Sequence, residues 1–283
     1  MEQSFTRTFN KIFVIESLDE SDSKTGKMLF DDIISRLAKY GDGSFTCEYL
    51  DISNRAEFDD AMIKIAIECG RGVKPILHLE IHGSELGLKL KNGDLIPYPI
   101  LAMQLSILNR GCKNNLFLTM AVCHGAMISF NIQLSEPAPF LGFIGAYNEV
   151  SDYDILLKYT EFYQEFLISR DFDKAFEYFL KVNAVDSKKW HLIDTYELFV
   201  KIYKDYVKEK LDPKKNKERA KLALKPYHFI NRRERRKKER NFIEVLNNSK
   251  QHFYKEHSRK FFMIDLYPEN EGRFNLPSNH TDL

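Results

Sequence analysis

The sequence predicts an α/β protein with a mostly parallel sheet sandwiched by helices, followed by a largely helical C-terminal region. Three observations lead to this prediction. Strand-like and helix-like segments alternate over roughly the first 150 residues. The strand-like segments are almost continuously apolar, as in parallel strands that are covered on both faces. Beyond this point the apolar residues recur at helical spacing.

The first part, residues 1–150, contains the segments of the predicted sheet. Strands are expected at residues 11–16, 44–50, 75–81, 114–122 and 139–147. Helices are expected between them, at residues 28–40, 56–70, 98–110 and 124–134. The pair Asn92-Gly93 lies between two short alternating runs and indicates a hairpin. We therefore treat residues 1–150 as one core domain.

The second part, residues 151–283, is mainly helical and either completes the core or is appended to it. Aromatic spacing predicts helices over 153–182, and a strongly amphipathic pattern predicts one over 191–211. A further helix is expected at 242–257, and the apolar run 261–268 is expected to form a terminal strand.

The composition limits the classes of protein to which the chain can belong. Hydrophobic residues make up 43% and charged residues 29%, a balance typical of soluble globular proteins. The net charge of +1 creates no global field that would select a membrane or nucleic acid. There is no long apolar run and no apolar signal core, so we expect a cytoplasmic protein. The four cysteines are scattered, which fits reduced thiols, and closely paired metal ligands are lacking, so no metal or cofactor is expected.

Two motifs with catalytic potential follow apolar strands. His82-Gly83 comes directly after residues 75–81, and Cys123 comes directly after residues 114–122. Because parallel strands end at the same edge of a sheet, His82 and Cys123 can face each other if these strands are neighbours. An imidazole can take the proton of a thiol and later protonate a leaving amine. The backbone N–H groups of Cys123 and Gly83 are candidate donors to an oxyanion.

Each of these residues also has an ordinary structural explanation when it is taken alone. A buried cysteine is commonly a small apolar side chain, and a histidine at a strand end is commonly a structural hydrogen-bonding group. The matched placement of the two, with glycines beside both, favours an active site. Glu80 shares a face with His82, so it either orients the imidazole or lies at the edge of the site. His124 is expected to point away along the following helix.

The two motifs, HLEIHGSELGL and LTMAVCHGA, resemble those of the caspase-like cysteine peptidases, the group of caspases, metacaspases, clostripain and CHAT proteases. In this chain, as in that family, a strand ending in His-Gly is followed about forty residues later by a strand ending in Ala-x-Cys-x-Gly. The resemblance covers roughly residues 10–150. It implies the caspase–haemoglobinase fold, with His82 as the base, Cys123 as the nucleophile and Gly83 as the glycine beside the base. It further implies a role in bacterial antiviral defence.

The sequence does not determine which side chain such a peptidase would prefer beside the cleaved bond. Many relatives that cut after basic residues carry an acid where this chain has Ala121. Glu149, Asp152 and Asp154 follow the strand 139–147 and could supply an acidic pocket that prefers a basic side chain. They could equally be the acidic start of an exposed helix.

These observations predict a cysteine endopeptidase that hydrolyses a protein substrate and is kept latent until a regulatory partner or signal switches it on. The alternative is a non-catalytic interaction module on the same fold. Residues 213–240 carry thirteen Lys and Arg against three Glu, so this module would act either as a scaffold or by contact with nucleic acid. Its candidate contacts are Arg232, Arg233, Arg235 and Arg236. The interleaved glutamates also fit a solvated helix with internal ion pairs.

Overall fold

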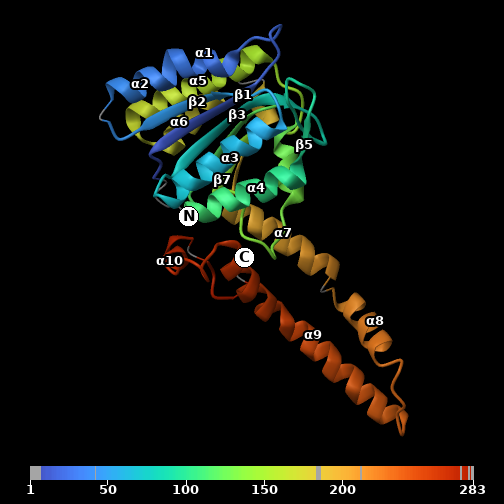
Figure 1. Cartoon of the computed structure of the whole chain (residues 1–283). Helices are drawn as coiled ribbons and strands as arrows, with labels where there is room; N and C mark the ends of the chain where they lie inside the picture. The colour runs from blue at the N-terminus through green and yellow to red at the C-terminus, as the bar shows by residue number, and fades with distance from the viewer. Residues whose placement is uncertain are drawn as a thin grey trace. The chain divides into compact units, whose positions relative to one another are not determined.

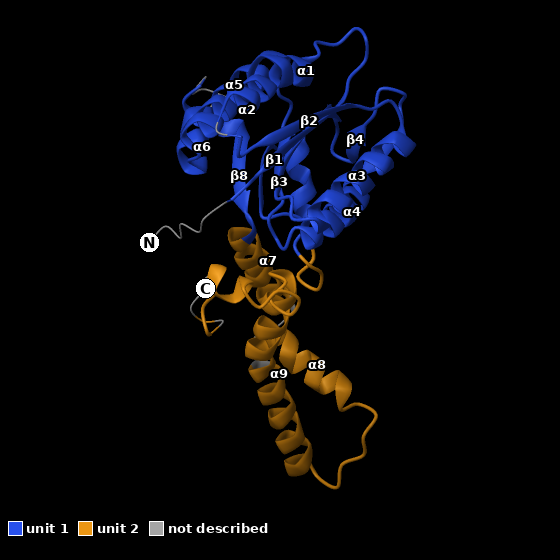
Figure 2. Cartoon of the chain, turned by 60° about the vertical axis from the view of Figure 1, so that its left-hand side comes forward, with its two compact units in different colours: residues 1–132, 138–195 blue, residues 133–137, 196–283 orange. Residues whose placement is uncertain are grey.

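The computed structural model describes residues 8–281, apart from residues 42, 183–185, 211, 275 and 280. The chain forms two compact units (Figure 2). Unit 1 consists of residues 1–132 and 138–195, and unit 2 consists of residues 133–137 and 196–283. The helices expected after residue 150 are therefore divided between the two units.

Unit 1 is built around a mixed sheet in which neighbouring strands are mostly parallel (Figure 1). Its main path has the order β2-β1-β3-β6-β7-β8, and only β8 runs antiparallel to its neighbour. The strands of this path are β1 (Lys11–Ser17), β2 (Thr46–Asp51), β3 (Pro75–Gly83), β6 (Phe117–Ala121), β7 (Gly142–Ala146) and β8 (Trp190–Asp194). A hairpin of β4 (Gly87–Lys89) and β5 (Leu95–Pro97) pairs with the end of β3. The predicted α/β architecture with a mostly parallel sheet is confirmed.

Helices cover both faces of this sheet (Figure 1). One layer contains α1 (Thr25–Leu29), a π-helical turn (Phe30–Ile34), α2 (Ser35–Tyr40), α5 (Asp152–Ser169) and α6 (Phe172–Lys181). The other layer contains α3 (Arg55–Gly70) and α4 (Tyr98–Gly111). This double cover explains the apolar strands, because every residue of β6 and β7 is buried. Both helices predicted within 153–182 are present, and they belong to unit 1.

Two sequence-based predictions in unit 1 are wrong. Residues 190–194 form the edge strand β8, although 191–211 was expected to be one helix. The helix α7 (Thr195–Lys210) begins only at Thr195, whose hydroxyl donates to the carbonyls of Phe140 and Leu141. Residues 124–134 form a short 3-10 helix, Gly125–Asn131, rather than an α-helix.

Unit 2 is helical, and α8 (Pro213–Ala223) packs against the long α9 (Arg232–Phe261). Aromatic rings form its core, where Phe199 of α7 lies 5.1 Å from Phe262 and 5.5 Å from Phe261, measured between ring centroids. The terminal strand expected at 261–268 is not present, because Phe261 ends α9 and the following residues turn into this aromatic core. The short α10 (Asn270–Arg273) follows. Among the residues that the structure describes, no helix is both long and apolar enough to cross a membrane.

Candidate active site

The strands that end at His82 and Cys123 are direct neighbours in the sheet. β3 and β6 pair in parallel from Ile76 opposite Phe117 to Glu80 opposite Ala121. His82 and Cys123 each lie two residues beyond the last pair of this register. Both residues line one small pocket at the carboxyl ends of these strands. The structure therefore brings together the two side chains that the sequence singled out.

Gly83 allows the ends of these two strands to approach closely. A Cβ atom at this position would lie 2.0 Å from the carbonyl oxygen of Cys123 and 2.3 Å from Cγ1 of Val122. No side chain fits into that space, because backbone atoms cannot yield as the end of a flexible side chain can. Gly83 is therefore required for the geometry of the pocket.

The thiol of Cys123 lies against the loop between β7 and α5. The backbone N–H of Val150 donates to Sγ over 3.5 Å, and Sγ lies 3.6 Å from the carbonyl oxygen of the same residue. Cys123 is half-buried. The N–H and the carbonyl of Val150 together fix the position of this thiol.

His82 is held by Asp22, which comes from the loop after β1. Nε2 of His82 lies 2.8 Å from Oδ2 of Asp22, and the side chains are 51% and 29% exposed. The loop itself is fixed, because the N–H of Asp19 donates to the same carboxylate oxygen over 2.8 Å. The hydrogen bond with His82 is the main reason why the pKa of Asp22 is lowered. Nδ1 of His82 makes no hydrogen bond to any residue that the structure describes, so this nitrogen is available to a thiol.

Sequence reasoning missed Asp22, which precedes His82 by sixty residues. The only feature of the sequence that could have indicated Asp22 is the acidic loop after the first strand, which lies at the same edge of the sheet as the two motifs. In the described part of the chain, Asp19, Asp22 and His82 are the only group whose potential ligand atoms lie close enough to hold a metal, within 4.8 Å of one another. The hydrogen bond between Asp22 and His82 accounts for this proximity without an ion.

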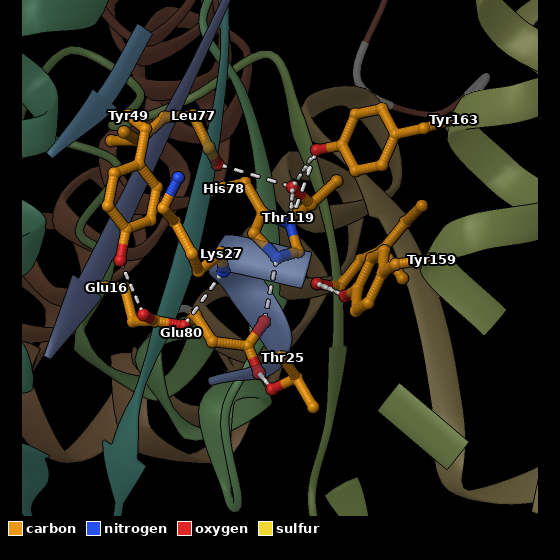
Figure 3. A network of polar contacts seen from close by, with 11 residues as sticks. Glu16, Thr25, Lys27, Tyr49, Leu77, His78, Glu80, Thr119, Tyr159 and Tyr163 are labelled. Carbon is orange, nitrogen blue, oxygen red and sulfur yellow. Dashed lines mark hydrogen bonds and ion pairs between the residues drawn. The ribbon is translucent and has the colours of Figure 1, made fainter. Parts of the chain in front are cut away.

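Glu80 lines the pocket, and its carboxylate is directed into a buried polar network (Figure 3). Oε2 lies 3.0 Å from Nε2 of His78, and the hydroxyl of Thr25 donates to Oε1 over 2.5 Å. His78 continues the network through Nδ1, which lies 2.9 Å from the hydroxyl of Thr119. Burial raises the pKa of Glu80, although the bonds from His78 and Thr25 act in the opposite direction. Glu80 therefore lines the pocket, and its hydrogen bonds are to His78 and Thr25 and not to His82.

A second buried carboxylate lies next to this network. Glu16 accepts hydrogen bonds from the hydroxyl of Tyr49 over 2.6 Å and from the backbone N–H of Lys27 over 3.1 Å (Figure 3). Helix α1 can come this close because Gly26 lacks a side chain, since a Cβ there would lie 2.8 Å from Oε1 of Glu16. Burial, with the bond to Glu16, raises the pKa of Tyr49 far above its usual value. The wall of the pocket that contains Glu80 is thus rigidly supported.

The three acids after β7 have different environments. Asp152 is exposed and lines the pocket with Cys123. Glu149 is exposed and is not among the residues that line it. Asp154 is buried at the start of α5, where the hydroxyl of Ser151 donates to its carboxylate over 2.6 Å. Of this group, only Asp152 is placed where it can affect a ligand in the pocket.

His124 fixes the backbone next to the thiol. It adopts a left-handed conformation with φ of 58°, and its Nδ1 lies 2.9 Å from the carbonyl oxygen of Tyr147. Its N–H donates to the carbonyl of Asn148 over 3.1 Å, and its own carbonyl accepts from the hydroxyl of Tyr98 over 2.9 Å. His124 therefore connects the end of β6 to the loop that contacts Cys123.

No family model matches this chain, and no curated protein matches it.

Proposed function

We propose that this chain is a cysteine endopeptidase of the caspase-like kind, with Cys123 as nucleophile and His82 as general base. One observation carries the proposal: the two residues line the same pocket at the carboxyl ends of neighbouring parallel strands. The order, spacing and flanking glycines of the two motifs match those of that family, and reactive groups of open α/β sheets lie at this edge.

The geometry supports a thioester mechanism. Nδ1 of His82 takes the proton of Cys123, and Sγ attacks the carbonyl carbon of the scissile peptide. The imidazolium then gives its proton to the leaving amine as the peptide bond breaks. Water attacks the resulting thioester with His82 as base, which releases the acid product and restores the thiol. Asp22 keeps the imidazole in position and stabilises its charged form during both steps.

The charge of the pocket suggests which substrates bind. Asp22 and Asp152 line it, and among the described residues that line it there is no Lys or Arg. Glu80 also lines it, and burial raises the pKa of this carboxyl. A substrate with a basic side chain beside the cut is therefore favoured by charge complementarity, although Ala121 replaces the acid of basic-specific relatives.

Substitution of the dyad tests the proposal. Wild type, Cys123→Ala and His82→Ala are each co-expressed with proteins encoded near the gene, and new protein termini are identified by mass spectrometry. Co-expression supplies the activating partner that a latent peptidase requires. We expect termini that are present only with the wild type, and a loss of cleavage of at least about 100-fold in each variant. Cys47→Ala is the matched control, and it should cleave like the wild type.

If both dyad variants cleave at the wild-type rate, or if Cys47→Ala loses activity with them, the assignment is wrong. A fold control is needed for each variant, and circular dichroism should show the same helix content in all of them.

A further inference from the structure

Helix α9 begins with a dense run of cations on its surface. Seven of the nine residues from Arg232 to Arg240 are Lys or Arg, and all seven are exposed. At about 100° per residue, five of them fall within an arc of about 140° on one side of the helix. This cationic strip consists of Arg232, Arg233, Arg236, Lys237 and Arg240. Arg235 and Lys238 lie on the other side.

The charges of the strip have no acidic partners among the residues that the structure describes. Glu234 caps the helix instead of pairing with an arginine, because its carboxylate accepts the N–H of Ile230 over 2.9 Å. Its own N–H donates to the side chain of Asn231 over 2.9 Å. In the part of the chain that the structure describes, none of the seven cations from Arg232 to Arg240 forms an ion pair. The expected helix is present, but the internal ion pairs that the interleaved glutamates suggested are not.

The rest of the segment concentrates positive charge further. Thirteen Lys and Arg less three Glu leave residues 213–240 with a net charge of +10, whereas the whole chain has +1. The remaining residues therefore carry −9, and the two signs are strongly segregated along the sequence. Helix α8, which packs against α9, contributes exposed lysines at positions 214, 215, 217 and 221. Segregation of this degree indicates a partner that is a polyanion.

An exposed aromatic side chain lies next to the strip in the sequence. The loop from Leu224 to Asn231 joins α8 to α9 at one end of this helix pair (Figure 2). In it, the side chain of Tyr227 is 65% exposed and that of Ile230 is 92% exposed. Sites for single-stranded nucleic acid combine a cationic track for the backbone with an aromatic ring on which a base stacks. A duplex satisfies only the cations, because its bases are already stacked on each other.

We infer that α8, α9 and the loop between them form a binding surface for single-stranded nucleic acid, in which the cationic strip contacts phosphates and Tyr227 stacks on a base. The surface lies entirely within unit 2. It does not depend on the proposed peptidase, and Cys123→Ala should bind like the wild type.

Binding of the full-length chain to a fluorescent 20-nucleotide oligo(U) and oligo(dT) tests this inference, measured by anisotropy from about 50 to 200 mM salt. The first variant, Arg232→Gln with Arg236→Gln, removes two charges from the strip. The matched control, Arg235→Gln with Lys238→Gln, removes two charges from the other side. We expect the first pair to weaken binding at least 10-fold and to reduce the salt slope by about 1.4, and the control to weaken it less than 3-fold. Glutamine is a good helix former, so circular dichroism should be unchanged.

A second variant examines the aromatic contact separately. Tyr227→Ala should weaken binding by roughly 5- to 150-fold, whereas Tyr227→Phe should bind like the wild type because it keeps the ring. The inference is overturned if the two double variants weaken binding equally, or if a duplex of the same length binds as tightly as the single strands. It is also overturned if polyglutamate binds as tightly as oligo(U), or if no strand binds at the lowest salt concentration.

Discussion

At the scale of single residues, Asp22 determines how His82 is presented to the thiol. Asp22→Asn keeps the size of the side chain but removes the negative charge that contacts Nε2 of His82. We expect kcat to fall about 10- to 100-fold because Asp22 positions the base, and KM should change little for a substrate that has no basic side chain beside the cut. The effect should be smaller than for a fully buried carboxylate, since Asp22 and His82 are 29% and 51% exposed. Asp19→Asn is the control, as Asp19 lies in the same loop without a side-chain bond to His82.

The pH dependence of the same pair provides a check that does not require activity. The hydrogen bond with His82 lowers the pKa of Asp22. The bond therefore contributes to the free energy of unfolding at pH values above about 3.9, the pKa of an Asp in the unfolded chain. This contribution is lost as the pH falls through the lower pKa of Asp22 in the folded state. In His82→Ala the pKa of Asp22, followed by NMR, should return toward its ordinary range. If it stays low, another group holds the carboxylate and Asp22 is not the partner of His82.

Glu80 should make the folded state less stable as the pH rises. Burial raises its pKa, so its stabilising protonated form is fully present below the unfolded value of about 4.3. This contribution is lost as the pH rises through the higher folded value, by about 1.4 kcal/mol for each unit of difference. Glu80→Gln cannot ionise and should gain stability relative to the wild type between pH 4.5 and 8, measured by urea unfolding. Parallel stability curves for the two proteins would contradict this expectation.

The sequence allowed His82 and Cys123 to be selected because each follows an apolar strand and has a glycine beside it. It did not identify Asp22, whose position depends on how the loop after β1 folds over the sheet edge. Glu80 was predicted to share a face with His82, but alternation along a strand also places His78 on that face. Periodicity alone cannot decide which of two histidines a carboxylate binds, and the buried network settles it in favour of His78.

At the scale of the elements, Gly83 tests whether the close approach of β3 and β6 is required. In Gly83→Ala the new methyl group would meet the carbonyl oxygen of Cys123 at 2.0 Å, which only a backbone shift can relieve. We expect a loss of at least about 2 kcal/mol in the free energy of unfolding, together with loss of cleavage. Gly70→Ala is the matched control, because nothing lies within 4 Å of its Cβ, and stability should change by less than about 0.5 kcal/mol. Equal stability of the two variants, measured by urea unfolding, would show that the strand ends can separate freely.

The central strands β6 and β7 were predictable, whereas the edge strand β8 was not, and their different burial explains why. β6 and β7 are buried along their whole length, so their sequences are continuously apolar. β8 lies at the edge and is mostly half-buried, so Leu192 and Ile193 fit equally well into the amphipathic pattern of the helix that follows. Residues 262–264 are buried as turns in the aromatic core of unit 2, in which the described residues form no strand. The composition of a segment indicates that its residues are buried. It does not indicate whether they are buried in a strand, a helix or a turn.

At the scale of the whole molecule, the division of the chain follows the sheet and not the change in sequence pattern near residue 150. Helices α5 and α6 cover one face of the sheet of unit 1, and the ring centroids of Phe162 and Phe172 lie 5.4 Å apart there. Strand β8 then extends the sheet, and unit 1 ends at Thr195. A pattern of helices alone cannot reveal which of them cover a sheet, because a helix has the same apolar stripe against a strand as against another helix.

Alkylation of the intact chain compares all four cysteines and separates an enzyme from a non-catalytic module. Cys69 and Cys112 are buried, and burial raises the pKa of Cys47, so these three thiols should react slowly. Cys123 lines the same pocket as His82 and has an N–H group directed at its sulfur, so it should react with iodoacetamide at least about 10-fold faster than Cys47 at pH 7. Peptide mapping by mass spectrometry gives the four rates, and Cys47 serves as the control because it is also half-buried. In His82→Ala the rate at Cys123 should fall to that of Cys47. Uniformly slow labelling in the wild type would mean that no thiolate forms, and the site would then be a structural edge of the sheet.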